Sequence, residues 1–188
     1  RQMCIRDSCS SSYNYDNIDY SRIDINGPED STVISVINVY KDSIDLKLDN
    51  VIGFSKGLYT KDDYSETEFN SSLGNLIADI IFKQADSVFY KSFGNNIDFV
   101  LQNHGGIRSS LLEGEIKLTD AYKILPFENE IVVLEISKEM FDEMVLFLSN
   151  EKFPHPISGF SIMDDKALID KEKSLNDKFF LATNDYLL

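Results

Sequence analysis

The sequence has 188 residues, of which 43% are hydrophobic and 12% aromatic, and its formal net charge is −14 at pH 7. A chain of this length and apolar content can bury about 70% of its unfolded surface in one domain, which excludes wholesale disorder. The negative charge excludes a general nucleic-acid-binding or anionic-membrane-binding surface, because such surfaces need an excess of lysine and arginine. No stretch reaches the roughly 18 apolar residues of a membrane-spanning helix.

Residues 1–29 are predicted to form a tail and linker, followed by a single domain over residues 30–188. The tail is polar and lacks a lasting period, apart from residues 22–25, which are compatible with an edge strand. Its opening Met3-Cys4-Ile5-Arg6-Asp7-Ser8 resembles translated sequencing-adapter read-through and is excluded from the fold prediction. Cys9 precedes three serines and allows two interpretations: the lipidated first residue of a mature lipoprotein, or part of a polar tail.

A helix is expected over residues 30–48, with Asp30 or Ser31 as its cap. Its apolar residues recur at helical spacing, so we predict that one face packs against another element. These residues are Val33, Ile37, Tyr40, Ile44 and Leu48. A strand is expected over residues 50–58, and a charged loop follows over residues 61–68.

The next helix, capped by Ser71 or Ser72, has a wide apolar face and should be central to the core. That face consists of Leu73, Leu76, Ile77, Ile80, Ile81, Ala85 and Val88. Gly74 near its start costs helix propensity, which either plain packing or the close approach of a ligand or backbone would explain.

A short strand over residues 97–102 leads into two glycines. Gly105 and Gly106 are expected to take backbone angles that other residues avoid and to expose main-chain N–H groups to a ligand. Arg108 follows, and its guanidinium offers a planar fork of donors that fits a phosphate or a carboxylate. A short helix capped by Thr119 or Asp120 should run through Lys123.

The last third of the chain alternates strands with one further helix. We predict a strand over residues 130–136 and a helix over residues 137–149, followed by strands over 157–163, 167–170 and 178–183. The inward face of the helix should consist of Met140, Phe141, Met144, Val145 and Leu148. Because strands and helices do not alternate strictly, the pattern favours an α+β domain.

Four motifs over residues 73–187 resemble, in order and spacing, the C-terminal substrate-recognition domain of bacterial 5'-nucleotidases and related UDP-sugar hydrolases. They are Leu73-Gly74-Asn75-Leu76-Ile77-Ala78-Asp79, Asn103-His104-Gly105-Gly106-Ile107-Arg108 followed by Gly114-Glu115-Ile116, Leu125-Pro126-Phe127-Glu128-Asn129, and Ala182-Thr183-Asn184-Asp185-Tyr186-Leu187. The resemblance implies the fold of that domain, α+β with a mixed β-sheet layered with helices.

By this resemblance, the arginine and the last asparagine hold a nucleotide, and the phenylalanine stacks on its base. The predicted substrate-binding residues are Asn103, Gly105, Gly106, Arg108, Phe127 and Asn129. The family also has arginines before the L-G-N-L helix, where this chain has Glu66-Thr67-Glu68-Phe69. A G-G-D-G segment after T-N-D-Y-L supplies a second stacking aromatic in the family, so we expect this domain to stop short of the usual C-terminal end.

No hydrolytic centre is predicted in this chain. A 5'-nucleotidase uses two metal ions held by clustered Asp, His and Asn ligands. His104 and His155 have no such neighbours in sequence. His104 is interpreted as a turn histidine bonded to backbone, with ligand contact as the alternative, and His155 as structural or solvent-exposed. We therefore assign no catalytic residue, metal ligand or cofactor here. The family holds its divalent metals in a separate metallophosphatase domain, which the resemblance implies as a partner domain or chain.

The sequence thus predicts the nucleotide-recognition domain of a 5'-nucleotidase-type phosphohydrolase, acting in nucleotide catabolism on a nucleoside monophosphate or related phosphoester. The missing metal ligands favour an alternative, a non-catalytic nucleotide-binding envelope lipoprotein. A UDP-sugar or cyclic-nucleotide substrate is a third interpretation. Export to the periplasm or cell envelope is expected, with Cys9 as the candidate lipid anchor.

Overall fold

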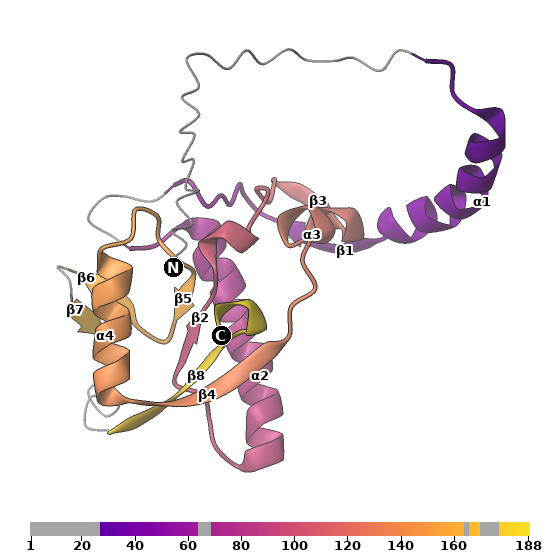
Figure 1. The fold of residues 1–188 in the computed structure, drawn as a ribbon. Helices are drawn as coiled ribbons and strands as arrows, with labels where there is room; N and C mark the ends of the chain where they lie inside the picture. The colour runs from indigo at the N-terminus through magenta and orange to yellow at the C-terminus, as the bar shows by residue number, and fades with distance from the viewer. Residues whose placement is uncertain (1–26, 64–68, 164–165, 170–176) are drawn as a thin grey trace, which may run out of the picture. The chain divides into compact units, whose positions relative to one another are not determined.

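The computed structural model describes residues 27–63, 69–163, 166–169 and 177–188, and Figure 1 shows its fold. The chain divides between Tyr40 and Lys41 into two units, which are described separately. All four motifs lie in the second unit. The edge strand suggested for residues 22–25, and the predicted tail up to residue 26, lie outside the described residues.

The first helix, α1 (Ser31–Leu48), has the predicted bounds. The backbone N–H of Thr32 donates to Oδ1 of Asp30 at 2.8 Å, so Asp30 is the cap. The predicted packing of its apolar face holds only at the end of the helix, because Leu48 is partly buried whereas Val33 and Ile37 are 55% and 50% exposed. The helix also carries exposed apolar residues between those positions, so its sequence does not define one buried stripe.

The core of the second unit is a four-stranded mixed sheet with one helix on each face (Figure 1). The strand order is β4-β8-β2-β5; β8 and β2 are parallel, and the two outer pairs are antiparallel. The prediction of an α+β domain with a mixed sheet layered with helices is confirmed. The strands are β2 (Phe99–Leu101), β4 (Ile131–Ser137), β5 (Ile157–Ser158) and β8 (Lys178–Asn184), and the helices are α2 (Ser72–Phe93) and α4 (Lys138–Ser149).

Alternation along the strands distributes the side chains between the two helices. Phe179 of β8 packs in one hydrophobic cluster with Phe141 of α4, whereas Ala182 packs with Ala78 of α2 on the other face. Phe99 of β2 stacks on Phe141, with ring centroids 4.5 Å apart. These two cores fix the positions at which β2 and β8 end.

A smaller layer covers the N-terminal end of α2. Leu73 and Ile77 of α2 pack there against Ile107, Leu111 and Ile124. Because Ile107 directly follows the two glycines of the second motif, this cluster anchors the glycine turn to α2. The layer contains an antiparallel pair of strands, β1 (Val51–Ser55) and β3 (Gly114–Lys117), and the short helix α3 (Leu118–Ile124).

The strand predicted over residues 157–163 is interrupted at Gly159. This glycine has φ +87°, and a Cβ there would lie 2.3 Å from the carbonyl oxygen of Asp98. β5 before it pairs with β2, whereas β6 (Ser161–Met163) after it pairs with β7 (Lys166–Leu168). The prediction of one continuous strand is therefore wrong, because a single glycine turns the chain between two sheets.

The caps of α2 and α3 were only partly predictable. Ser71 caps α2 as expected, accepting a hydrogen bond from the N–H of Gly74 at 3.2 Å. A Cβ on Gly74 would lie 2.6 Å from Oγ of Ser71, so packing around the cap explains this glycine. The expected caps of α3 are wrong: the helix begins at Leu118, and Asp120 instead accepts from the N–H of Lys117 at 2.9 Å.

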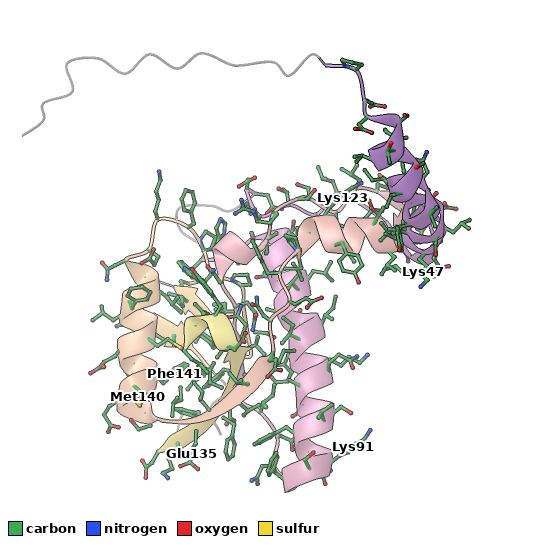
Figure 2. The ribbon with its side chains drawn as sticks, turned by 45° about the vertical axis from the view of Figure 1, so that its right-hand side comes forward. Lys47, Lys91, Lys123, Glu135, Met140 and Phe141 are labelled. Atoms are coloured by element: carbon green, nitrogen blue, oxygen red, sulfur yellow. The ribbon has the colours of Figure 1, made fainter. Side chains whose placement is uncertain are left out.

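One predicted core position of α4 is wrong as well. Met140 is 56% exposed, whereas its neighbour Phe141 is buried against the sheet (Figure 2). Met144 is partly buried and packs against the same core. Two adjacent residues of a helix point about 100° apart, so Met140 lies outside the stripe that faces the sheet.

Candidate functional site

All six predicted site residues line one pocket of about 440 Å³ in the second unit. Small-molecule sites commonly enclose about 300–1,000 Å³. The pocket is next to the carboxyl ends of the parallel strands β2 and β8, the edge at which open α/β sheets bind ligands. Its lining consists of Asn103, Gly105, Gly106, Arg108, Phe127, Asn129, Asn184 and Tyr186.

The glycine turn is a short 3-10 helix over His104–Gly106, with Asn103 as its cap. The N–H of Gly105 donates to Oδ1 of Asn103 at 3.0 Å, and the N–H of Gly106 donates to the carbonyl of Asn103 at 3.0 Å. Neither glycine has a positive φ. Both expectations for this turn are wrong: its backbone angles are ordinary, and its N–H groups are already bonded within the turn.

Gly106 leaves open space where a side chain would stand, since a Cβ there would have no neighbour within 4 Å. Gly106 itself lines the pocket. The glycine therefore keeps the wall of the pocket free of a side chain.

Arg108 is the cationic residue of the pocket lining, and its side chain is exposed. Its Nη1 donates to the carbonyl of Gly105 at 3.2 Å, and its backbone N–H donates to the carbonyl of Ile124 at 2.8 Å. Across the described part of the chain, no carboxylate forms an ion pair with Arg108. A guanidinium has five N–H donors, so most of them are available to an anion.

Two aromatic side chains line the same pocket. Phe127 is 57% exposed and Tyr186 is 71% exposed, although aromatic side chains usually bury most of their surface. Tyr186 belongs to the T-N-D-Y-L motif but was not assigned to the site from sequence. The family resemblance placed a second aromatic residue in a segment after T-N-D-Y-L. In the structure, Tyr186 of the motif itself lines the pocket.

Asn184 is the second lining residue that the sequence analysis missed. Its side chain is buried, with an exposed fraction of 7%, and its Oδ1 has no hydrogen-bond partner among the described residues. It ends β8, which runs parallel to β2, and the predicted site begins just after β2. The position of T-N-D at the end of a predicted strand was the available signal.

Neither histidine lines the pocket, although His104 is the first residue of the glycine turn. Nδ1 of His104 is 3.0 Å from the carbonyl oxygen of Pro154, and its ring stacks on Phe153 at a centroid distance of 5.2 Å. Burial lowers the pKa of His104, and the hydrogen bond to the Pro154 carbonyl opposes that shift. Nδ1 of His155 is 3.2 Å from the carbonyl oxygen of Gln102. His104 is therefore a turn histidine bonded to the backbone, as predicted, and His155 is partly buried rather than fully exposed.

Within the described ranges, no three His, Cys, Asp or Glu side chains gather in a way that could hold a metal ion. In the same ranges, no helix combines the length and apolar character that crossing a membrane requires.

Over residues 51–160, more than half of the chain, the sequence matches the family described as 5'-nucleotidase, C-terminal domain. The probable 5'-nucleotidase of Treponema pallidum (strain Nichols) is 40% identical over 62 residues, which are 30% of this chain and 10% of that protein. Endonuclease YhcR of Bacillus subtilis (strain 168) is 29% identical over 155 residues, which are 79% of this chain and 11% of that protein. The chain thus spans about a tenth of the length of these relatives.

Solved structures of similar fold include two nucleotidases. The 5'-nucleotidase precursor of Thermus thermophilus has a TM-score of 0.58 and 22% identity, over 85% of this chain and 34% of that one. The NAD nucleotidase of Haemophilus influenzae has a TM-score of 0.51 and 17% identity, over 84% of this chain and 32% of that one. At these identities the likeness concerns the fold alone. Together with the match over residues 51–160, it confirms the resemblance seen in the four motifs: the chain belongs to the 5'-nucleotidase C-terminal domain family.

Proposed function

We propose that this chain is the nucleotide-recognition part of a 5'-nucleotidase-type phosphohydrolase and that it binds a nucleoside monophosphate or related phosphoester. The observation that carries this proposal is the pocket that gathers Arg108, Phe127, Asn129 and Tyr186 from three separate motifs. A cation, two exposed aromatic rings and amide groups are the chemistry that a nucleotide needs.

The phosphate is held by Arg108. Its guanidinium fits two oxygens of a phosphate with two hydrogen bonds, and its contact with the Gly105 carbonyl orients the side chain beside the turn. Because the N–H groups of the turn are bonded internally, the arginine side chain carries the attraction for the anion. A single local cation also explains how a chain of net charge −14 attracts an anionic ligand.

The base is held by Phe127, Tyr186 and Asn129. Stacking of a base on an aromatic side chain contributes about 1–3 kcal/mol, so each ring lost should weaken binding roughly 5- to 150-fold. The carboxamide of Asn129 has both donors and an acceptor for the edge of the base. Asn103, Gly105 and Gly106 form the wall between the phosphate and the base.

Hydrolysis requires a metallophosphatase domain or chain that supplies divalent metals and activates a water. The names of the relatives support a phosphoester substrate, since both nucleotidases and endonucleases cleave phosphoester bonds. The alternative of a non-catalytic envelope lipoprotein gains no support from these comparisons. Export to the periplasm or cell envelope, with a lipid anchor at Cys9, remains part of the proposal.

Two titrations test this function. AMP should bind the full chain, and adenosine should bind more weakly because it lacks the phosphate that Arg108 holds; calorimetry measures both. The variants Phe127→Ala and Tyr186→Ala should each weaken AMP binding while leaving the fold intact, because both side chains are largely exposed.

Addition of a metallophosphatase partner to the chain should increase AMP hydrolysis. An absence of AMP binding, or equal affinity for AMP and adenosine, would overturn the proposal.

A further inference from the structure

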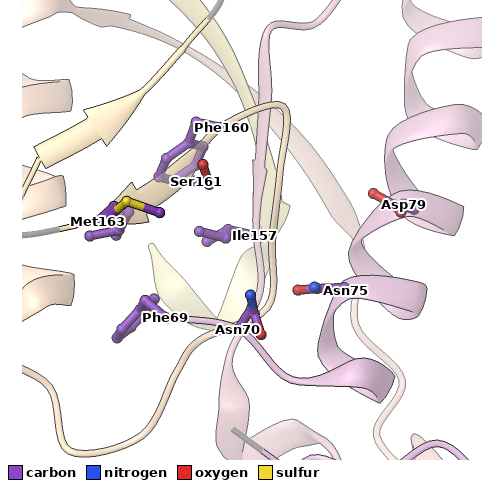
Figure 3. Close-up of a pocket in the computed structure, with 9 residues that line it drawn as sticks. Phe69, Asn70, Asn75, Asp79, Ile157, Phe160, Ser161 and Met163 are labelled. Atoms are coloured by element: carbon purple, nitrogen blue, oxygen red, sulfur yellow. The ribbon is translucent and has the colours of Figure 1, made fainter. Parts of the chain in front are cut away.

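The L-G-N-L-I-A-D motif has no part in the pocket described above, yet its two polar residues, Asn75 and Asp79, line a second one. They lie one turn apart on α2, and Figure 3 shows both side chains extending from the helix toward a shared hollow. The two pockets have no lining residue in common. Asn75 is partly buried and Asp79 is exposed, so both lie outside the buried stripe with which α2 packs into the core.

The hollow has a volume of about 400 Å³, which is within the range of small-molecule sites. Its apolar side is built by residues opposite α2, as Figure 3 shows for those it labels. Ile157, Phe160 and Ile162 of this side are buried and belong to the core, so they form a firm floor. The apolar lining is completed by Phe69 and Met163.

The polar side presents groups that lack a full set of hydrogen bonds. Oγ of Ser158 donates to Oδ1 of Asp79 at 2.6 Å, which orients the carboxylate and leaves its second oxygen available. The side chains of Asn75 and Ser161 have no hydrogen-bond partner in the part of the chain that the structure describes. An oriented carboxylate and an amide on α2 therefore face the apolar floor across the hollow, and the hydroxyl of Ser161 lies beside Phe160 on the floor side.

We propose that this second pocket binds a small organic cation, with an ammonium group at Asp79 and Asn75 and an apolar body against Phe160 and Phe69. An ammonium group donates three hydrogen bonds, which suits the carboxylate and the amide oxygen. Aromatic faces attract a cation as well. The net charge of −14 raises the local concentration of cations and disfavours anions. This inference is independent of the proposed nucleotide function.

The test uses the full, isotope-labelled chain and 2-phenylethylamine, followed by nuclear magnetic resonance. The amine should shift the resonances of Asn75 and of residues 157–163, and 2-phenylethanol, which has the same ring but no charge, should bind at least about tenfold more weakly. Asp79→Asn should also lose about tenfold in amine affinity. Asp142→Asn, at an exposed position of α4 that pairs with Lys138 at 3.7 Å, should bind the amine like the wild type.

If Asp79→Asn fails to fold, Asn75→Ala and the comparison of amine with alcohol on the wild type decide the question. Equal binding of the amine and the alcohol would overturn the proposal, as would equal amine affinity of the Asp79 and Asp142 variants. Amine-induced shifts confined to residues outside this pocket would overturn it too.

Discussion

Glu130 and Asp185 exchange two hydrogen bonds at the point where two motifs meet. The N–H of Glu130 donates to the Oδ1 of Asp185 at 3.1 Å, and the N–H of Asp185 donates to the carbonyl of Glu130 at 3.0 Å. The pair continues the β4–β8 ladder beyond the last strand partners, Ile131 and Asn184. It thereby fixes the neighbouring Asn129 and Tyr186 on the wall of the same pocket.

Removal of the Asp185 carboxylate should loosen this junction. We expect Asp185→Ala to lower the free energy of unfolding by about 0.5–1.5 kcal/mol, the usual net value of one hydrogen bond, and to weaken AMP binding as well. Asp185→Asn keeps an oxygen acceptor for the N–H of Glu130 and should lose less of both. Urea unfolding and AMP calorimetry measure the two effects. If the alanine and asparagine variants behave alike, the carboxylate is not what fixes the junction.

Substitution by alanine should affect stability very differently at two glycines. Gly159→Ala should lower the free energy of unfolding by more than about 2 kcal/mol, because its φ is positive and its Cβ would collide with the carbonyl of Asp98. Gly106→Ala should change stability by less than about 0.5 kcal/mol, because its Cβ would stand in open space. Because Gly106 lines the pocket, an added methyl group there should also weaken AMP binding. Thermal unfolding and AMP titration of both variants test this contrast.

The neighbours Phe141 and Met140 offer a matched pair on α4. Phe141 is buried in a cluster of aromatic rings, so Phe141→Ala should cost about 3–5 kcal/mol of unfolding free energy. Met140→Ala should change it by less than about 0.5 kcal/mol, because Met140 is exposed and alanine favours a helix. Urea unfolding compares the two. A large loss for the Met140 variant would mean that this side chain is covered in solution.

Stability should depend on pH through His104. Burial lowers its pKa below 6.5, so the unfolded chain takes up the proton before the folded chain does. The contribution of His104 is therefore fully present above pH 6.5 and is lost as the pH falls through the lowered pKa. His104→Gln removes this titration. The stability advantage of the wild type over the variant should then be smaller at about pH 5 than at about pH 7.5.

Urea unfolding of both proteins at the two pH values measures that difference. Groups that do not interact with His104 contribute equally to both proteins and cancel in the comparison. An advantage that stays constant between the two pH values would show that His104 does not titrate differently in the folded and unfolded chains.

Much of the sheet and its two helices followed from sequence, because β4 and α4 have long and regular apolar patterns. The features that could not be predicted from sequence depend on tertiary contacts. The turn at Gly159 has the same apolar flanks as a continuous strand, and only the approach of the Asp98 carbonyl explains it. The apolar residues of α1 that recur at helical spacing are at least half exposed, apart from Leu48.

The candidate site shows the same division. All six residues predicted from the short motifs line the pocket, because the backbone shape of each motif depends mainly on its own residues. Tyr186 and Asn184 were missed because their place in the pocket depends on the pairing of β8 with β2 and β4, which joins segments far apart in sequence. The hydrogen bonds from the turn N–H groups to Asn103 were not predicted either, because Asn103 was expected to bind the ligand and not to cap the turn.

The measurement that tests the central claim most directly is a calorimetric titration of AMP into the wild type, Arg108→Ala and the control Lys91→Ala. Lys91 lies in the last turn of α2, outside the pocket lining (Figure 2). Loss of a charge-assisted contact of about 1.5–3 kcal/mol should weaken AMP binding roughly 10- to 150-fold in the Arg108 variant and leave the Lys91 variant unchanged. Identical saturation of all three proteins would contradict the account, because the phosphate would then be bound elsewhere.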